Sequence, residues 1–384
     1  MTKSLFIRRG NDTFAAEVAC AIVFCVFTFT YLFFYQADLL TMEQHVLSGG
    51  LTIYNRTAGA IIITAVLFLL QTGIDAATKK CIKMPAITYF PSILLLSILT
   101  DIRPDVCDGY STGKWLWLAP VSVLFFISAA YISAQMLDKT TANTKNSIQH
   151  CWVNLMIMGG LYLFLCATAN TDRAFHKRMK IENCIAKGEY MKALQVRTDR
   201  YDRDSSTTML RAFALSKENK LGESLFEYSP YGGSDALLPH GKSTRCLIIH
   251  NNDIYTHVAK PMKQDSRTIN YLLWMKRHGY AKASLEDYLL CGYLLDRNID
   301  LFAKELAQSK KYRLSDLPKH YREALILYNH IRSTPTVVYT DDVMDTDYYD
   351  FQKTLRSNPQ KGVAVSLAEK SYGNTYWFYY FSGK

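Results

Sequence analysis

Residues 14–35 read FAAEVACAIVFCVFTFTYLFFY, and this apolar run decides how the rest of the chain is interpreted. A helix needs about 20 mainly apolar residues to cross the hydrocarbon core of a bilayer. Lys3, Arg8 and Arg9 precede the run, as basic residues precede the core of a signal peptide. The apolar core is too long for a signal peptide, however, and no small-x-small cleavage site follows it. We therefore predict an uncleaved membrane anchor.

Four more apolar segments of sufficient length follow this anchor. They are Ala58–Ile74, Met84–Thr100, Leu116–Met136 and Cys151–Thr168. Charged residues are sparse across this part, since only 11 of the 44 lysines and arginines and 9 of the 34 acids precede residue 169. The sequence predicts an all-α protein with a bundle of about five transmembrane helices over residues 1–171. The remaining residues, 172–384, are expected to form a soluble domain.

The orientation of the spans follows from their connections, because lysines and arginines near span ends tend to stay in the cytoplasm. With the N-terminus inside, eight basic residues are cytoplasmic: Lys3, Arg8, Arg9, Lys79, Lys80, Lys83, Lys139 and Lys145. Three basic residues are then outside: Arg56, Arg103 and Lys114. Five spans place the C-terminal domain on the extracytoplasmic side.

One feature of the sequence opposes this arrangement. Four more basic residues directly follow the fifth span and bring the outer total to seven: Arg173, Lys177, Arg178 and Lys180. Long domains are translocated largely regardless of charge, so we retain the N-in, C-out prediction. In a rival arrangement one segment fails to span, and Ala58–Ile74 is the one expected to fail because it is short and carries Gln71. We expect Gln71 and Asn154 each to make one interhelical hydrogen bond.

Helical hairpins are predicted beyond residue 172. In IAKGEYMKAL, residues 185–194, Gly188 is expected to end a helix in the left-handed conformation and Ala193 to provide a small packing surface in the next. The same offset recurs from Asn219 to Ser224 and from Asn298 to Ala303. Further helices are expected over residues 266–278 and 318–332, the second with Tyr321, Leu325 and Tyr328 on a buried face. The aromatic tail YGNTYWFYYFSGK is expected to cap the stack.

The stretch GEYMKAL is similar to the turn and second-helix start of tetratricopeptide repeats. The third copy departs from that pattern because Asp300 stands where an aromatic residue belongs. The whole layout resembles an uncharacterised family of bacterial inner-membrane proteins with a degenerate tetratricopeptide-like C-terminal domain. That resemblance implies a multi-pass protein of the bacterial inner membrane, and it implies no activity.

Three motifs of the C-terminal domain point weakly to chemistry. HGKST at 240–244 lacks the first glycine of a phosphate-binding loop and is expected to be an exposed turn. His250 and His257 lie two helical turns apart, too far for one metal ion. DDVMDTDYYD at 341–350 lacks the order of a calcium loop, and its carboxylates suit the N-terminus of a helix near Tyr348–Arg356. No cofactor or metal is expected.

The nine cysteines are scattered, with no C-x-x-C pair or Cys/His pairing at metal spacing. A disulfide framework is therefore not expected in the C-terminal domain. Basic and acidic residues alternate there without the clustered patch that nucleic-acid binding needs, so we expect no nucleic-acid partner. The expected partners are the lipid bilayer and a protein or peptide bound by the helical hairpins.

The first outer connection carries the acids Asp38 and Glu43. LLTMEQHVL is expected to form an amphipathic surface helix with Leu39, Leu40, Val46 and Leu47 inward and Glu43 outward, ended by Gly49 and Gly50. The sharper alternative is that Asp38 and Glu43 converge with Asp101 or Asp105 of the next outer loop to bind a divalent cation.

Two functional hypotheses follow from these patterns. In the first, a membrane anchor presents a helical-repeat domain that acts as a scaffold or binding protein. In the second, the chain is a membrane enzyme acting on a lipid-linked substrate, because multi-span glycosyltransferases place an acid in the first outer loop, where Asp38 and Glu43 stand. That similarity concerns layout alone, and layout is weak evidence for function. The sequence favours the binding protein.

Overall fold

A computed structural model describes residues 3–78, 84–105, 113–140, 147–199, 202–241, 244–260, 267–357 and 360–382. Its contacts divide the chain into two units, Met1–Asp172 and Arg173–Lys384. All regular elements of the described residues are helices, with two isolated bridges, His240–Thr244 and Ala259–Ala281, so the protein is all-α. Some residues used above lie outside the described ranges: Lys79, Lys80, Lys83, Lys145, Lys242, Ser243 and Ser266.

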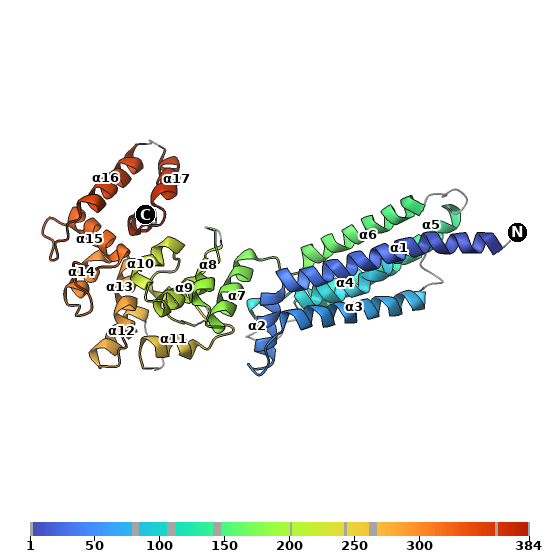
Figure 1. Cartoon of the computed structure of the whole chain (residues 1–384), viewed down its shortest axis with the longest axis horizontal. Coiled ribbons are helices and arrows are strands. Elements are labelled where there is room, and N and C mark those ends of the chain that lie inside the picture. The colour runs from blue at the N-terminus through green and yellow to red at the C-terminus, as the bar shows by residue number, and fades with distance from the viewer. Residues whose placement is uncertain are drawn as a thin grey trace. The chain divides into compact units, whose positions relative to one another are not determined.

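The first unit is a bundle of long apolar helices (Figure 1). It contains α1 (Lys3–Thr30), a π-helical turn (Tyr31–Tyr35), α2 (Ala37–Leu47), α3 (Arg56–Thr78), a 3-10 turn (Pro85–Tyr89), α4 (Phe90–Thr100), α5 (Trp115–Thr140) and α6 (Ser147–Thr168). Helix α1 packs against α3 and α6, while α4 packs against α3, α5 and α6. The bundle therefore has α1, α3, α4 and α6 at its centre.

Four helices of this unit are long and apolar enough to cross a membrane: Phe14–Tyr35, Arg56–Thr78, Trp115–Ile132 and Cys151–Thr168. The second apolar segment is not short, as the rival arrangement supposed, because its helix has 23 residues. The short segment is the third. Pro85 and Pro91 lie at the starts of the 3-10 turn and of α4, and a proline has no N–H to continue a preceding helix. Helix α4 consequently has only 11 residues.

The third apolar segment nevertheless runs the length of the bundle beside α6. The Ala86 N–H donates to Asn154 Oδ1 at 3.1 Å near one end. The Asn170 N–H donates to the Thr100 carbonyl at 3.1 Å near the other end. The 3-10 turn and α4 together extend about 27 Å by their helical rises, close to the hydrocarbon thickness of about 30 Å.

The same segment runs antiparallel to α3. Gln71 Nε2 donates to Thr88 Oγ1 at 3.1 Å, and Ser92 Oγ donates to the Leu67 carbonyl at 2.8 Å. The expected interhelical bonds of Gln71 and Asn154 are thus confirmed. The bond of Asn154 satisfies the backbone N–H of Ala86 at the proline break, and a backbone group at membrane depth needs such a protein partner. The five apolar segments therefore alternate in direction through the bundle.

Alternation gives a first prediction, for the sidedness of the connections. Reporter fusions after residues 80, 110 and 145 and at the C-terminus should read inside, outside, inside, outside, because each apolar segment reverses the chain. If Pro85–Thr100 did not cross, the same fusions would read inside, inside, outside, inside. A fusion after residue 50 is outside in both arrangements and controls for insertion of α1.

The second unit consists of shorter helices (Figure 1). They are α7 (Arg173–Ala186), α8 (Tyr190–Gln195), α9 (Ser205–Lys217), α10 (Leu221–Ser224), α11 (Asn251–Val258), α12 (Thr268–Arg277), α13 (Leu285–Leu295), α14 (Ile299–Ala307), α15 (Lys319–Ile331), α16 (Asp342–Arg356), α17 (Lys361–Tyr372) and α18 (Tyr376–Ser382). Two 3-10 turns, Leu225–Tyr228 and Ser234–Ala236, lie among them. One hydrophobic core runs from Ile181 to Phe378 and holds these helices together.

Three hairpin turns occur near the predicted positions. Gly188 (φ +74°) separates α7 from α8, and Asn219 (φ +55°) separates α9 from α10, as expected. In the third turn the left-handed residue is Arg297 (φ +57°), one position before the expected Asn298. Asn298 instead caps α14 by accepting from the Leu301 N–H. The second helices of the first two hairpins have only 6 and 4 residues, so the hairpins are unequal in length.

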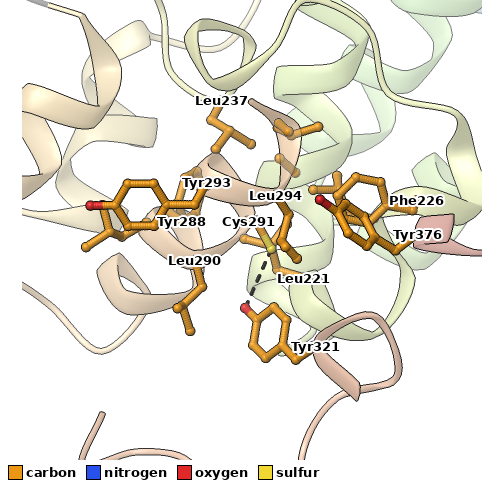
Figure 2. Packing of buried hydrophobic residues seen from close by; sticks show 14 of the residues in the cluster. Leu221, Phe226, Leu237, Tyr288, Leu290, Cys291, Tyr293, Leu294, Tyr321 and Tyr376 are labelled. Atoms are coloured by element: carbon orange, nitrogen blue, oxygen red, sulfur yellow. Dashed lines mark hydrogen bonds between the residues drawn. The ribbon is translucent and has the colours of Figure 1, made fainter. Parts of the chain in front are cut away.

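Aromatic residues of α15 and of the C-terminal tail belong to the hydrophobic core of the second unit. Tyr321 of α15 is buried, and its hydroxyl lies 3.6 Å from Cys291 Sγ of α13 (Figure 2). The predicted buried face of Tyr321, Leu325 and Tyr328 is confirmed. Tyr376 at the start of α18 is buried beside Phe226, with ring centroids 4.9 Å apart. The tail therefore packs onto the helices of its own unit, as expected.

Candidate functional site

Asp38 and Glu43, the two acids of the connection after the first apolar segment, lie in different surroundings. Asp38 forms an ion pair with Arg56 at 3.6 Å, with both side chains partly exposed. Glu43 is 9% exposed, so the expectation that it faces outward is wrong. Leu47, expected inward, is 60% exposed. The buried face of α2 instead carries Leu39 and Leu40 with Glu43 one turn further on, as helical spacing allows.

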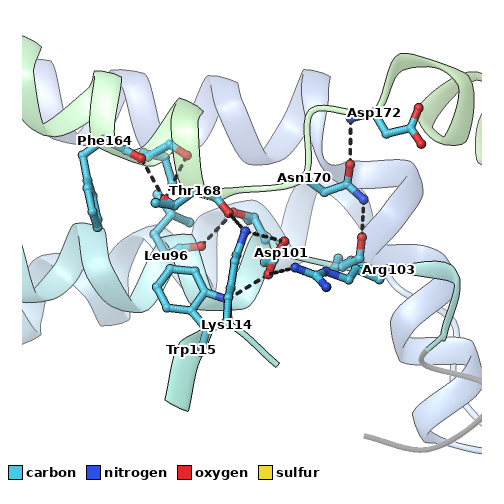
Figure 3. A network of polar contacts seen from close by, with 12 residues as sticks. Leu96, Asp101, Arg103, Lys114, Trp115, Phe164, Thr168, Asn170 and Asp172 are labelled. Atoms are coloured by element: carbon cyan, nitrogen blue, oxygen red, sulfur yellow. Dashed lines mark hydrogen bonds and ion pairs between the residues drawn. The ribbon is translucent and has the colours of Figure 1, made fainter. Parts of the chain in front are cut away.

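Asp101 lies in a polar network where α4 and α6 end and α5 begins (Figure 3). Its carboxylate accepts from Trp115 Nε1 at 2.9 Å and pairs with Lys114 at 3.2 Å and Arg103 at 3.5 Å. Lys114 Nζ also donates to the Thr168 carbonyl at 2.5 Å. Three donors surround a side chain that is only 7% exposed, so the carboxylate ties the ends of these helices together.

The structure does not bring the four candidate acids, Asp38, Glu43, Asp101 and Asp105, into a cation site. Asp38 and Asp101 are paired with different basic residues, Glu43 is buried, and Asp105 is exposed. Within the described part of the chain, no three His, Cys, Asp or Glu side chains gather closely enough to hold a metal ion. The network of Asp101 can be explained by its role in closing one end of the bundle.

The motifs of the C-terminal unit also have structural roles. Asp341 is the N-cap of α16 and accepts from the Met344 N–H at 3.1 Å, so this helix begins earlier than expected. His257 Nε2 lies 2.8 Å from Ser216 Oγ, and burial lowers the pKa of His257 to about 4. His250 is the N-cap residue of α11. The paired histidines thus belong to the start and the end of one short helix.

A cleft of 880 Å³ in the second unit was not predicted from the sequence. Its walls come from the segment 229–235, the start of α12, the end of α13, the start of α14, and α18. Residues lining it are as far apart in the chain as Arg203 and Ser382. The cleft exists only because the core brings these distant segments together.

The segment SPYGGSD, residues 229–235, forms one wall of the cleft and is held tightly in place. Gly232 (φ +100°) passes so close to Ser205 that a Cβ would lie 2.4 Å from its Oγ. Asp296 accepts from the Ser234 N–H at 2.8 Å and from Ser234 Oγ at 2.6 Å. Asp235 Oδ1 accepts from the Thr268 N–H at 3.0 Å. Contacts within the protein therefore fix this wall without the help of a ligand.

Three arginines line the same cleft: Arg203, Arg267 and Arg297. The two acids that line it, Asp235 and Asp296, accept hydrogen bonds from the wall itself. The Arg297 guanidinium lies 4.8 Å above the Tyr379 ring and donates to the Tyr379 carbonyl at 3.3 Å. The lining therefore has a positive formal charge, and both of its aspartates are occupied by hydrogen bonds to the backbone.

Residues 110–281 and 268–383 match the model of a family of unknown function, DUF6057. The chain belongs to this family. Comparison with curated proteins gave no match, and comparison with solved structures gave none either. The layout predicted membership of an uncharacterised family, and the match confirms that the family has no assigned function. Every cleft residue lies within the segments that match DUF6057.

The cleft of this DUF6057 protein combines aromatic rings with polar groups. Phe226, Tyr231, Tyr293, Phe378 and Tyr379 line it beside the arginines. Its described lining contains no histidine, cysteine, lysine or glutamate. Ligand sites commonly combine apolar walls with a few placed polar groups. The arrangement is suited to hold a ligand.

Proposed function

We propose that the chain is a membrane-anchored binding protein whose helical C-terminal unit holds a ligand in the 880 Å³ cleft. The anchor is the helical bundle of the first unit. In this proposal the anchor lies in a bacterial inner membrane, and the C-terminal unit is extracytoplasmic. The unit acts in the manner of a degenerate tetratricopeptide-like domain, which binds a partner through helical hairpins.

The cleft itself is the observation that carries the proposal. Its volume lies within the range of roughly 300 to 1,000 Å³ that is typical of ligand sites. Its glycine-containing wall is fixed by Asp296 and by close contact with Ser205. Preorganisation of this kind lowers the entropic cost of binding. A wall held by buried contacts on one side and open to a cavity on the other favours binding.

The alternative, an enzyme acting on a lipid-linked substrate, has no comparable support. The acids on which it depended are engaged elsewhere, Asp38 with Arg56 and Asp101 with Lys114. Within the described lining of the cleft, the acids Asp235 and Asp296 are hydrogen-bonded to the wall, and no histidine or cysteine lies beside them. The geometry therefore favours binding over covalent chemistry.

The proposal is tested by filling the cleft. Leu301 lines it from α14 and is 43% exposed, so Leu301→Trp adds bulk to the cleft without entering the core. Leu314 is 49% exposed and lines a separate cavity of 320 Å³, so Leu314→Trp is the matched control. The full-length proteins in micelles are heated with and without an extract of small molecules and peptides from the source cells.

We expect the extract to raise the melting temperature of the wild-type protein and of Leu314→Trp, since a ligand that binds only the folded state stabilises it. Leu301→Trp should show no such increase. Equal increases in all three proteins would exclude the cleft as the binding site. Mass spectrometry of the extract before and after incubation tests the enzyme alternative, because time-dependent conversion of a component would contradict simple binding.

A further inference from the structure

We propose that the cleft binds a small ligand that carries a carboxylate or phosphate group next to a ring. This inference rests on the proposed function and adds the chemical class of the ligand. The anionic group would be held by Arg297 and Arg267, which both line the cleft. The ring would lie against the aromatic wall.

The ion pairs of the unit single out these two arginines. Arg178 pairs with Asp204 at 3.4 Å, and Arg332 pairs with Asp300 at 2.5 Å. Neither Arg267 nor Arg297 has a carboxylate partner among the residues that the structure describes. The planar guanidinium group matches carboxylate and phosphate with two parallel hydrogen bonds. Two arginines that line a cavity without acidic partners therefore favour an anion.

The backbone at Arg297 gives a second, independent argument. Arg297 adopts φ +57° at the C-terminal end of α13. Glycine or asparagine usually occupies such a position, because a side chain there is strained. Glycine does occupy it after α7 and α12, at Gly188 and Gly279, and asparagine after α9, at Asn219. A bulky residue at this position points to a use for its side chain, and Arg297 lines the cleft with its guanidinium over the ring of Tyr379.

The aromatic lining indicates the rest of the ligand. Tyr231 lines the cleft yet is 57% exposed, an unusual position for a large ring on a held loop. The Arg297 guanidinium lies over one face of the Tyr379 ring, and this contact holds the guanidinium in place. A flat or cyclic group placed between these side chains would gain contact area at little entropic cost, because both side chains have few rotatable bonds.

Four soluble probes and one lipid pair test this assignment on the full-length protein in micelles. Glucose 6-phosphate and glucuronate carry the anion beside a ring, glucose is their neutral match, and inorganic phosphate lacks the ring. Short-chain phosphatidylglycerol, compared with phosphatidylcholine, tests a lipid headgroup as the source of the anion. The variants are Arg297→Gly and Arg267→Gln. Arg332→Gln, which removes an arginine paired with Asp300 outside the cleft lining, is the control.

We expect one of the anionic probes to bind at least about tenfold more tightly than its neutral match, and both cleft variants to lose that difference. Arg297→Gly loses the contacts of the guanidinium with Tyr379 but relieves the positive φ, and because these effects oppose each other its melting temperature should stay close to that of the wild-type protein. Arg267→Gln removes an exposed side chain and should also leave it close. Tighter binding of phosphatidylglycerol alone, lost in the same variants, would assign the anion to a lipid headgroup and overturn the ring, because the glycerol headgroup has none.

Three results would overturn the inference: equal affinity for glucose and its anionic matches, binding unchanged in Arg297→Gly and Arg267→Gln, or no binding of any anionic probe. These outcomes are separable from failure of the proposed function. If the cell extract still stabilises the wild-type protein but not Leu301→Trp, the cleft binds a ligand whose recognition does not depend on an anion. If the extract stabilises Leu301→Trp as much as the wild-type protein, the cleft is not the binding site.

Discussion

Replacing Glu323 with alanine is expected to lower the free energy of unfolding of the second unit by about 3–5 kcal/mol. Glu323 is 2% exposed, and its Oε2 accepts from the Tyr376 N–H at 2.7 Å and lies 2.9 Å from His320 Nδ1. His320 Nε2 accepts from the Phe226 N–H at 3.3 Å, so Nδ1 carries the proton that is donated to Glu323. Alanine would leave two buried donors without an acceptor.

Two variants show whether the loss comes from these hydrogen bonds. Glu323→Gln keeps the side-chain volume and one acceptor oxygen, so its loss should be clearly smaller than that of alanine. Glu227→Ala removes an exposed carboxylate that pairs with Lys319 at 3.1 Å, and such surface pairs contribute about 0–1 kcal/mol. The measurement is denaturant unfolding followed by tryptophan fluorescence, since Trp377 donates to the Glu323 carbonyl. A Glu323→Ala loss no larger than that of Glu227→Ala would refute the role assigned to this carboxylate.

The helical content and the apolar segments were predictable because they depend on local sequence. An apolar run as long as Phe14–Tyr35 can satisfy its backbone within a membrane only as a helix, and the structure has a helix there. Gly188 and Asn219 mark helix ends by the same local logic, because these residue types adopt positive φ at low cost. The buried face of α15 follows from the spacing of Tyr321 and Leu325.

Predictions that needed the tertiary structure failed. The burial of Glu43 depends on which face of α2 meets the bundle, and hydrophobic spacing alone pointed to Leu47 instead. The third apolar segment reaches the length of the bundle as a 3-10 turn followed by a short helix, and Asn154 of another helix satisfies its broken end. Neither arrangement can be read from a window of sequence, because each depends on a neighbour distant in the chain.

The cleft was missed for the same reason. Its arginines lie at positions 203, 267 and 297, and nothing in their spacing places them together. The glycine pair of SPYGGSD was the available local signal, since adjacent glycines often mark a backbone that must pass close to another group. Arg297 gave no signal at all, because a left-handed conformation is not expected of arginine.

The second large effect is expected for Glu182→Ala, which should destabilise the unit by about 3–5 kcal/mol. Glu182 of α7 is fully buried, and one oxygen, Oε1, accepts from the N–H groups of Leu247 and Ile248 at 2.6 Å and of Ile249 at 3.2 Å. This single side chain therefore holds the segment before α11 against α7. Alanine would leave three backbone donors without their acceptor, and each buried unpaired donor costs about 1–3 kcal/mol.

Glu182→Gln separates the hydrogen bonds from the charge. Its amide oxygen can accept from the same three N–H groups, so the glutamine variant should retain most of the stability that alanine loses.

Burial raises the pKa of the Glu182 carboxyl above its ordinary value of 4.5, so the folded protein keeps this proton to a higher pH than the unfolded chain. Glu182 therefore contributes stability that is fully present below about pH 4.5 and is lost as the pH rises through its raised folded-state pKa, and the glutamine variant, which has no proton to release, should lack that part of the slope. Unfolding free energies measured from about pH 5 to about pH 8 would show the two curves diverging, with the glutamine variant favoured at the higher pH. Parallel curves, or a glutamine variant as unstable as alanine, would mean that the carboxylate is bound in its ionised form and that charge, not hydrogen bonding alone, holds the segment.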